Sequence, residues 1–214
     1  MNAIAFSMAL CAPCVLASIA GAAVSVSVNP NSTSVVSISS VTGTGTQLDP
    51  IVINENWFGG SLESTITING AATEANLGIN PSDTAFAWGI YVQKRVTNNS
   101  GIDWTSYDNE LQEVIGVPSL DGDGLSFAQQ DPSVRPFTAN LLPTVIEEID
   151  LRDFVNFSGG TVLAGQTLIM NFVITDNTPS DEFYLRQRPN FVVPTPAAAP
   201  ALLLGAGLIL RRRR

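Results

Sequence analysis

The chain has 214 residues, with nineteen Asp and Glu against ten Lys and Arg, a net charge of -9 and no histidine. This length suits one ordinary domain with terminal segments, and the acidic balance argues against nucleic acid as a partner, because phosphate binding needs a basic surface. Without histidine, the Ser-His-Asp triad, Cys-His catalysis and His-ligated zinc are excluded in their usual forms, which leaves carboxylate chemistry.

The N-terminal residues form an apolar leader. Ala3 to Ala20 is almost wholly apolar, and Ala20-Gly21-Ala22 supplies the small-x-small pattern that signal peptidase accepts. Residues 1–22 are therefore predicted to be a signal helix that is cleaved after Ala22. Both cysteines, Cys11 and Cys14, lie in this leader rather than at the start of a helix in a folded domain, so a redox Cys-x-x-Cys pair is disfavoured and the mature chain would hold no disulfide.

The central segment, residues 23–190, is dominated by a hydrophobic period of two. Alternating series are typical of β-strands with one buried face. They occur at Val24/Val26/Val28, Leu62/Ser64/Ile66/Ile68, Phe86/Trp88/Ile90/Val92 and Leu168/Met170/Phe172/Ile174. Clusters of Asn, Gly, Asp and Pro separate the series and predict turns. We therefore expect an all-β domain, an antiparallel β-sandwich of the jelly-roll or Ig-like kind.

One segment of this domain is ambiguous. Thr144 to Phe157 carries Val145, Ile146, Ile149 and Phe154 near helical spacing, but the same residues could form a strand. The sequence alone leaves the two alternatives open.

Two acidic groups are candidates for a site. Glu147, Glu148, Asp150 and Asp153 could supply the paired carboxylates of a glycosidase, but neighbouring side chains on a strand point to opposite faces, so a solvated acidic edge is favoured. Asp121-Gly122-Asp123-Gly124 resembles the start of a calcium loop, but Leu125 and Pro132 occupy ligand positions of an EF-hand. We predict no catalytic residue, no metal site and no cofactor; a carboxylate-dependent hydrolase is the least favoured alternative.

Aromatic side chains offer a second kind of site. Trp57 and Trp104 flank turns rich in Gly and Asn, and exposed tryptophan rings stack on sugars. They are candidate glycan contacts of a carbohydrate-binding or adhesive module, although packing in the core is the favoured interpretation.

The C-terminal segment, residues 191–214, combines three features. Pro194 and Pro196 keep the backbone extended. Ala197 to Leu210 is apolar, but as a helix it would span only ~21 Å of a ~30 Å hydrocarbon core. Arg211 to Arg214 obey the positive-inside rule and would hold the C-terminus in the cytoplasm as a topological lock. A short hydrophobic helix is therefore expected to tether the exported domain transiently to the membrane.

In this order of features the tail resembles the PEP-CTERM sorting signal of Gram-negative bacteria, in its Val-Pro-x-Pro-Ala variant. The residues that carry the resemblance are Val193, Pro194, Thr195, Pro196 and Ala197, then the apolar run, then Arg211, Arg212, Arg213 and Arg214. Thr195 stands where the principal pattern has Glu. The resemblance implies export, recognition and cleavage by an exosortase-type sorting enzyme, and association with exopolysaccharide or biofilm matrix.

Two stretches of the central segment are also similar to the bodies of PEP-CTERM proteins. In Val96 to Tyr107 a strand would end, Asn and Gly would turn the chain, and Trp104 would restart the next strand; Phe154 to Gly160 with Leu163 to Gln166 would form the last hairpin. The sequence thus predicts a non-enzymatic protein, secreted or in the cell envelope, with a structural or matrix role. Signal peptidase, an exosortase-type enzyme and exopolysaccharide are the expected partners.

Overall fold

The computed structural model describes residues 24–59, 63–69, 89–120, 124–128, 137–148, 152–176 and 182–190. Three predictions of the sequence lie outside these residues: the signal segment 1–22, the sorting segment 191–214 with Val193–Ala197 and Arg211–Arg214, and the acidic positions of the loop 121–123.

The described residues form β-strands and one short 3-10 helix, so the all-β prediction is confirmed. The elements in chain order are β1 (Ser25–Val28), η1 (Pro30–Ser32), β2 (Val36–Thr42), β3 (Ile51–Trp57), β4 (Ser64–Asn69), β5 (Gly89–Asn98), β6 (Ser106–Gln112), β7 (Leu125–Phe127), β8 (Thr138–Ala139), β9 (Thr144–Glu148), β10 (Phe154–Ser158), β11 (Thr167–Asp176) and β12 (Glu182–Asn190).

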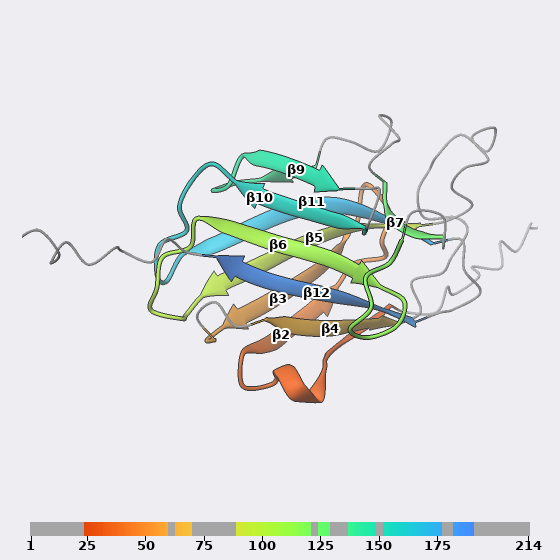
Figure 1. The fold of residues 1–214 in the computed structure, drawn as a ribbon, viewed down its shortest axis with the longest axis horizontal. Coiled ribbons are helices and arrows are strands. Elements are labelled where there is room, and N and C mark those ends of the chain that lie inside the picture. Colours follow the sequence, from red (N-terminus) through yellow and green to blue (C-terminus); the bar gives the residue numbers. More distant parts are fainter. Residues whose placement is uncertain are drawn as a thin grey trace, which may run out of the picture.

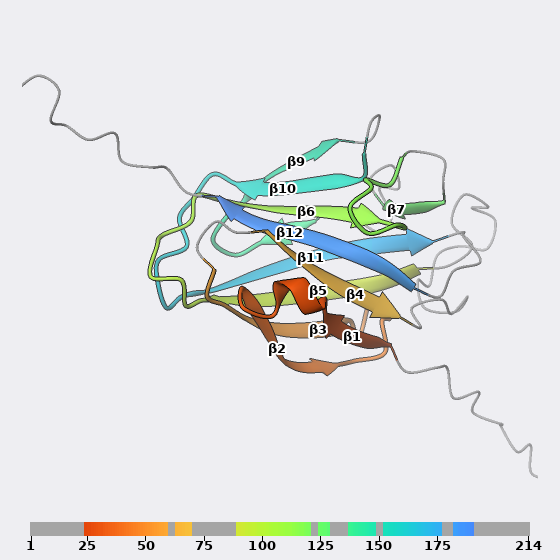
Figure 2. The same ribbon diagram turned by 60° about the horizontal axis from the view of Figure 1, so that its bottom comes forward.

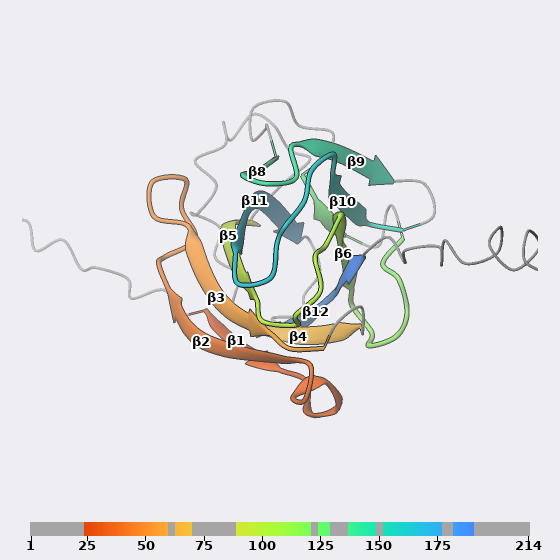
Figure 3. The same cartoon turned by 90° about the vertical axis from the view of Figure 1, so that its left-hand side faces the viewer.

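The strands form two sheets (Figure 1). The first, which we call sheet A, has the order β1-β4-β12-β6-β10-β9; the second, sheet B, has the order β2-β3-β5-β11-β7, with β8 also paired to β11. Seen from one end, the two sheets enclose a common interior, with β3, β5 and β11 on one side and β12, β6 and β10 on the other (Figure 3).

The strand pairs are antiparallel with one exception among the described strands. β3 and β5 are parallel, with Ile53 opposite Lys94, so the prediction of a wholly antiparallel fold is wrong at this pair. Parallel neighbours cannot be joined by a tight turn and need a crossover connection. Here the chain leaves sheet B after β3, adds β4 to sheet A and then returns to sheet B as β5, which makes the parallel pairing possible.

Alternating side chains build the core between the sheets. In β3 the buried positions are Ile51, Ile53, Glu55 and Trp57, with partly exposed residues between them. Inward side chains of both sheets join in one continuous hydrophobic cluster. Burial of each such Val, Ile, Leu or Phe side chain contributes roughly 1.5–3 kcal/mol, so this core can hold the sheets together without a disulfide.

The ambiguous segment 144–157 contains two strands rather than a helix. β9 and β10 pair antiparallel, with Ile146 opposite Asn156. β10 pairs on its other side with β6, at the centre of the sheet, so its inward Val155 and Phe157 are fully buried. Because β10 has a hydrogen-bonded neighbour on each side, its backbone is extended rather than helical, although the spacing of the apolar residues also allowed a helix.

The predicted last hairpin is wrong. β10 belongs to sheet A and β11 to sheet B, so the residues between them cross from one sheet to the other. The residues between β5 and β6 make a similar crossing, and the two crossings are held together by paired backbone hydrogen bonds between Trp104 and Val162, at 3.0 and 2.9 Å. Asn98 also binds across, since its Nδ2 donates to the carbonyl oxygens of Ile102 and Val162.

Candidate functional site

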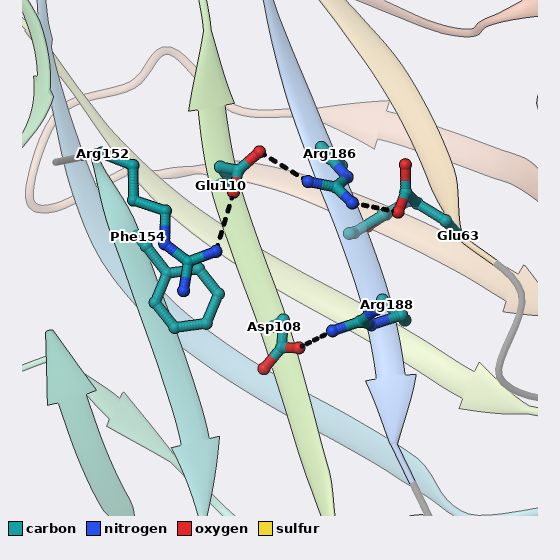
Figure 4. A pocket seen from close by; sticks show the side chains of 8 residues that line it. Glu63, Asp108, Glu110, Arg152, Phe154, Arg186 and Arg188 are labelled. Atoms are coloured by element: carbon teal, nitrogen blue, oxygen red, sulfur yellow. Dashed lines mark hydrogen bonds and ion pairs between the residues drawn. The ribbon is translucent and has the colours of Figure 1, made fainter. Parts of the chain in front are cut away.

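The outer face of sheet A carries a group of charged side chains around a small pocket. We call it the outer-face arginine cluster; its members are Glu63, Asp108, Glu110, Arg152, Phe154, Arg186 and Arg188 (Figure 4). Three of the six Lys and Arg residues that precede the terminal Arg211–Arg214 run belong to it. The cluster thus holds half of these cations together with three carboxylates, Glu63, Asp108 and Glu110.

The register of the strands explains why these side chains meet. Successive side chains of a strand point to opposite faces, so Arg186 and Arg188 of β12 face outward while Leu185 and Gln187 are buried. Arg186 lies directly opposite Glu110 of β6. On the other side of β6, Glu110 lies opposite Phe154 of β10. Arg186, Glu110 and Phe154 thus lie side by side on three adjacent strands, and the pair Arg186–Glu110 has opposite charges.

Glu110 is the centre of the cluster. Its side chain is only 4% exposed, and its two oxygens accept hydrogen bonds from different cations. Oε1 accepts from Nη1 of Arg186 at 2.9 Å and from Nε2 of Gln112 at 3.0 Å, while Oε2 accepts from Nη1 of Arg152 at 3.2 Å. A buried carboxylate needs such partners because an unpaired charge in the interior is costly.

Asp108 forms a second centre, one pleat along the same strand. Its Oδ2 accepts from Nη2 of Arg188 at 3.1 Å and from Nδ2 of Asn190 at 2.7 Å, and its Oδ1 accepts from Nδ2 of Asn156 at 2.6 Å. These donors come from β12 and β10, so Asp108, like Glu110, connects the strands on either side of β6.

The arginines are held by further carboxylates at the edge of the cluster. Nη2 of Arg186 donates to Glu63, and this hydrogen bond, together with Glu110, outweighs burial and raises the pKa of Arg186 above its usual value. Burial alone would lower the pKa of Arg152, but hydrogen bonds to Glu148 and Glu110 raise it. The guanidinium of Arg152 also lies over the ring of Phe154, 4.0 Å from its centroid. Both arginines therefore stay charged at any physiological pH.

Two cavities open beside the cluster. The smaller has a volume of about 40 Å³ and is lined by the cluster itself with Gln187. The larger, of about 430 Å³, shares Glu63 and Arg186 with it. Its other described lining residues are mainly amides, hydroxyls and backbone: Asn29, Asn31, Ser32, Thr65, Gln112, Ile115 and Gly116. Such a lining can exchange hydrogen bonds with a polar, uncharged ligand.

The carboxylates of the cluster are already engaged. Glu63, Asp108 and Glu110 each accept a hydrogen bond from an arginine. Among the described residues, no three Cys, His, Asp or Glu side chains come together as metal ligands. The cluster offers a set of hydrogen-bond donors and acceptors and a stacked Arg–Phe pair. This arrangement suits the binding of a polar ligand.

Trp57 and Trp104 pack in the core, as the favoured interpretation of the sequence has it, so the alternative that they are exposed glycan contacts is wrong. Both side chains are fully buried and pack edge to face, with ring centroids 6.2 Å apart. Trp57 continues the inward series of β3, and Trp104 lies in the crossing between the sheets, where its Nε1 donates to Oγ of Ser100 at 3.2 Å. Both rings also contact Tyr107, so they are core residues.

The predicted solvated acidic edge is also incorrect in part. Asp153 is 1% exposed and accepts a hydrogen bond from Oγ of Ser126 at 2.7 Å. Glu148 is partly exposed and pairs with Nε of Arg152 at 2.7 Å. Glu147 is also partly buried, and Asp150 lies outside the described residues. These acids thus have different surroundings and do not form one face.

Sequence reasoning missed the outer-face arginine cluster. Its signal was available only in part: Arg186 and Arg188 alternate with Leu185 and Gln187, which indicates an outward face, but nothing in the local sequence pairs them with Glu110. That pairing depends on β12 lying next to β6, although five strands, β7 to β11, lie between them in the chain.

Within the described residues, no helix is both long and apolar enough to cross a membrane. Comparison of the chain with protein-family models, curated proteins and solved structures finds no match in any of the three.

Proposed function

We propose that this protein is an exported structural domain of the envelope or extracellular matrix of a Gram-negative bacterium, sorted through residues 191–214. An exosortase-type enzyme would cut near Val193–Ala197 after signal peptidase has removed residues 1–22, and the domain itself would carry no catalytic activity. The observation that best supports this proposal is the position of β12. It ends at Asn190, three residues before Val193 of the sorting motif, and it is hydrogen-bonded to β4 on one side and to β6 on the other.

A central strand is a firm attachment for a tail. β12 cannot be peeled from a sheet edge, because β4 and β6 must both be released for it to leave. β1 and β12 run in the same direction, since each is antiparallel to β4. The start of β1 and the end of β12 therefore lie at opposite ends of sheet A (Figure 2). A domain held at Asn190 would thus present its other end away from the membrane, as a spacer does.

We assign the domain, residues 23–190, to the β-sandwich architecture. Two sheets that share one core, with most chain connections crossing between them, support this assignment over a simple meander. The order of sheet A, in which sequence neighbours are mostly not spatial neighbours, is of the kind found in jelly rolls and Ig-like sandwiches.

The proposal is tested by the fate of the two terminal segments. In the native host, we expect the secreted form to have an intact mass that lacks residues 1–22 and the C-terminal segment. Replacing Arg211–Arg214 by four serines removes the positive charge that orients the tail, so trimming and final location should both change. Arg95→Ser, an exposed cation on β5, is the control and should be processed normally. Recovery of the full-length chain from the cytosol, or normal processing of the four-serine variant, would contradict the proposal.

A second candidate function is the binding of a polysaccharide at the outer-face arginine cluster. It is favoured by the stacked Arg152–Phe154 pair and by the amide-lined cavity that shares Glu63 and Arg186. The cluster balances its charges, and the whole chain is negative, so a neutral polymer suits it better than an anionic one.

This second function can be measured by affinity electrophoresis in gels that contain dextran, as a neutral polymer, or alginate, as an anionic one. We expect dextran to retard the protein and Arg186→Gln to reduce the retardation several-fold, because a planar five-donor group is lost. Arg95→Gln on sheet B is the matched control. Equal mobility with and without dextran would reject binding of this polymer.

A further inference from the structure

Five polar side chains lie in the core between the two sheets. Glu55 and Lys94 come from β3 and β5 of sheet B, and Ser64, Tyr107 and Gln187 come from β4, β6 and β12 of sheet A. All five are buried, and the side chains of Glu55 and Lys94 are 0% exposed. Lys94 is moreover the only lysine of the chain. Burial of a lone lysine and a carboxylate is costly for folding, so their presence calls for a chemical reason.

Hydrogen bonds join four of these side chains in a closed ring. Nζ of Lys94 donates to Oε2 of Glu55 at 2.5 Å, and Nε2 of Gln187 donates to the same oxygen at 3.1 Å. On the other side, the hydroxyl of Tyr107 donates to Oε1 of Gln187 at 3.1 Å and accepts from Nζ of Lys94 at 3.3 Å. The carboxylate thus bridges the amine and the amide nitrogen, and the phenol bridges the amine and the amide oxygen.

The surroundings favour reactive forms of these groups. Burial lowers the pKa of Lys94, and the charge and hydrogen bond of Glu55 oppose this effect. Burial also raises the pKa of Tyr107 well above its usual value, so its hydroxyl remains a proton donor. Oε1 of Glu55 has no hydrogen-bond partner among the described residues. In a medium of low dielectric constant, transfer of one proton from Lys94 to Glu55 replaces two buried charges by two neutral groups.

Water is kept away from the ring. Trp57 and Trp104 both pack against Tyr107, with ring centroids 5.8 and 5.9 Å from it, and all three side chains are fully buried. A neutral amine held beside a carboxamide in a dry site, with a proton carrier on one side and a hydrogen-bond donor on the carbonyl oxygen, has the parts that acyl transfer needs.

We propose that Lys94 and Gln187 react with each other to form an intramolecular amide bond between the two sheets. Nζ of Lys94 attacks Cδ of Gln187, and the new carbon–nitrogen bond forms while the developing charge on Oε1 is stabilised by the hydroxyl of Tyr107. Oε2 of Glu55 takes a proton from Nζ and delivers a proton to Nε2. The Cδ–Nε2 bond then breaks and ammonia leaves, so the reaction needs no oxidant, reductant or cofactor.

The hydrogen bonds of the ring favour Gln187 over Glu55 as the side chain that the amine of Lys94 attacks. The donor that would stabilise a developing oxyanion, Tyr107, is hydrogen-bonded to the oxygen of Gln187. Oε2 of Glu55 lies in contact with both nitrogens, which is the place of a proton carrier. Oγ of Ser64, 3.5 Å from Nε2 of Gln187, helps to fix the orientation of the amide.

The bond would connect β5 of sheet B to β12 of sheet A. The two sheets are otherwise held face to face by side-chain packing, and the described residues contain no cysteine. A covalent link at Gln187 would pass a load on the C-terminal end of β12 directly into the other sheet. This inference does not depend on how the tail is sorted.

Mass spectrometry of the purified protein tests the proposal. We expect the folded domain to weigh one ammonia less than its sequence, and tandem spectra of a proteolytic digest to contain a branched peptide that joins Lys94 to Gln187. In denaturant, reductive dimethylation should leave Lys94 unlabelled. An unchanged mass with a labelled Lys94 would overturn the proposal. Loss of water instead, with a branched peptide between Lys94 and Glu55, would overturn the assignment of Gln187.

Variants test the roles of the individual groups. Glu55→Gln keeps the shape of the side chain but removes the proton carrier, so Lys94 should be labelled. Tyr107→Phe should slow the reaction during refolding at least several-fold. Asn109→Leu is the matched control, because Asn109 is a buried amide of β6 that contacts Sδ of Met170 and lies outside the ring; it should retain the bond. Near-ultraviolet circular dichroism shows whether each variant folds, and the mass of the unaltered protein decides the proposal even if one does not. A full yield of the bond in Glu55→Gln would contradict the role of Glu55.

Discussion

At the scale of single residues, burial decides how much each charged side chain contributes to the stability of the fold. Glu63 and Glu110 both pair with Arg186, but the side chain of Glu63 is 43% exposed and that of Glu110 only 4%. An exposed ion pair is screened by water and contributes little, whereas a buried carboxylate organises every donor around it. The two residues therefore offer a comparison within one cluster.

We predict that Glu110→Gln lowers the free energy of unfolding by about 1–3 kcal/mol, because two arginines and Gln112 lose the charged acceptor that they share. Glu63→Gln should change it by less than about 1 kcal/mol, since water can replace the carboxylate at the edge of the cluster. Urea denaturation followed by tryptophan fluorescence measures both. Equal losses for the two variants would show that burial of Glu110 does not control its contribution.

At the scale of elements, the connection between β10 and β11, which crosses from sheet A to sheet B, depends on two glycines for different reasons. In the connection from β10 to β11, a Cβ at Gly160 would lie 2.0 Å from the carbonyl oxygen of Leu141, which is backbone and cannot rotate away. Gly165, in the same connection, has φ +83° but open space around the position of a Cβ. One glycine thus permits a close approach and the other a left-handed turn.

We predict that Gly160→Ala lowers the free energy of unfolding by about 2–3 kcal/mol, because the backbone around Leu141 must shift to admit the methyl group. Gly165→Ala should cost only about 1 kcal/mol, the strain of a left-handed conformation. The same urea titrations measure the difference. A larger loss for Gly165→Ala would mean that the turn, and not the contact with Leu141, limits this connection.

At the scale of the whole molecule, β12 unites the features described above. Its outward face carries Arg186 and Arg188 of the cluster, its inward face carries Gln187 of the buried ring, and its last residue precedes the sorting segment. Because β12 lies between β4 and β6, it transmits contacts across sheet A, and through the buried ring it reaches β3 and β5. Attachment at the C-terminus would therefore act on a strand that is hydrogen-bonded to a neighbour on each side.

Several of the strands were predictable. A period of two over β1, β4, β5 and β11 follows from the pleat of a strand with one buried face, and this pattern is local. The same pattern also held an unused signal: Glu55 and Lys94 occupy inward positions in the series of β3 and β5, between Ile53 and Trp57 and between Val92 and Val96. A charge at such a position predicts a buried partner.

The sequence by itself determined the all-β class, the positions of several strands, and the terminal segments that predict export and sorting, because each depends on residues close together in the chain. Only the tertiary structure decided that β3 and β5 are parallel, that Trp57 and Trp104 are buried, and that Glu110 meets Arg152 and Arg186. It alone brings Lys94 and Gln187 into one ring. These facts depend on which strands become neighbours, and that choice is made by the packing of two sheets over a shared core rather than by any local pattern.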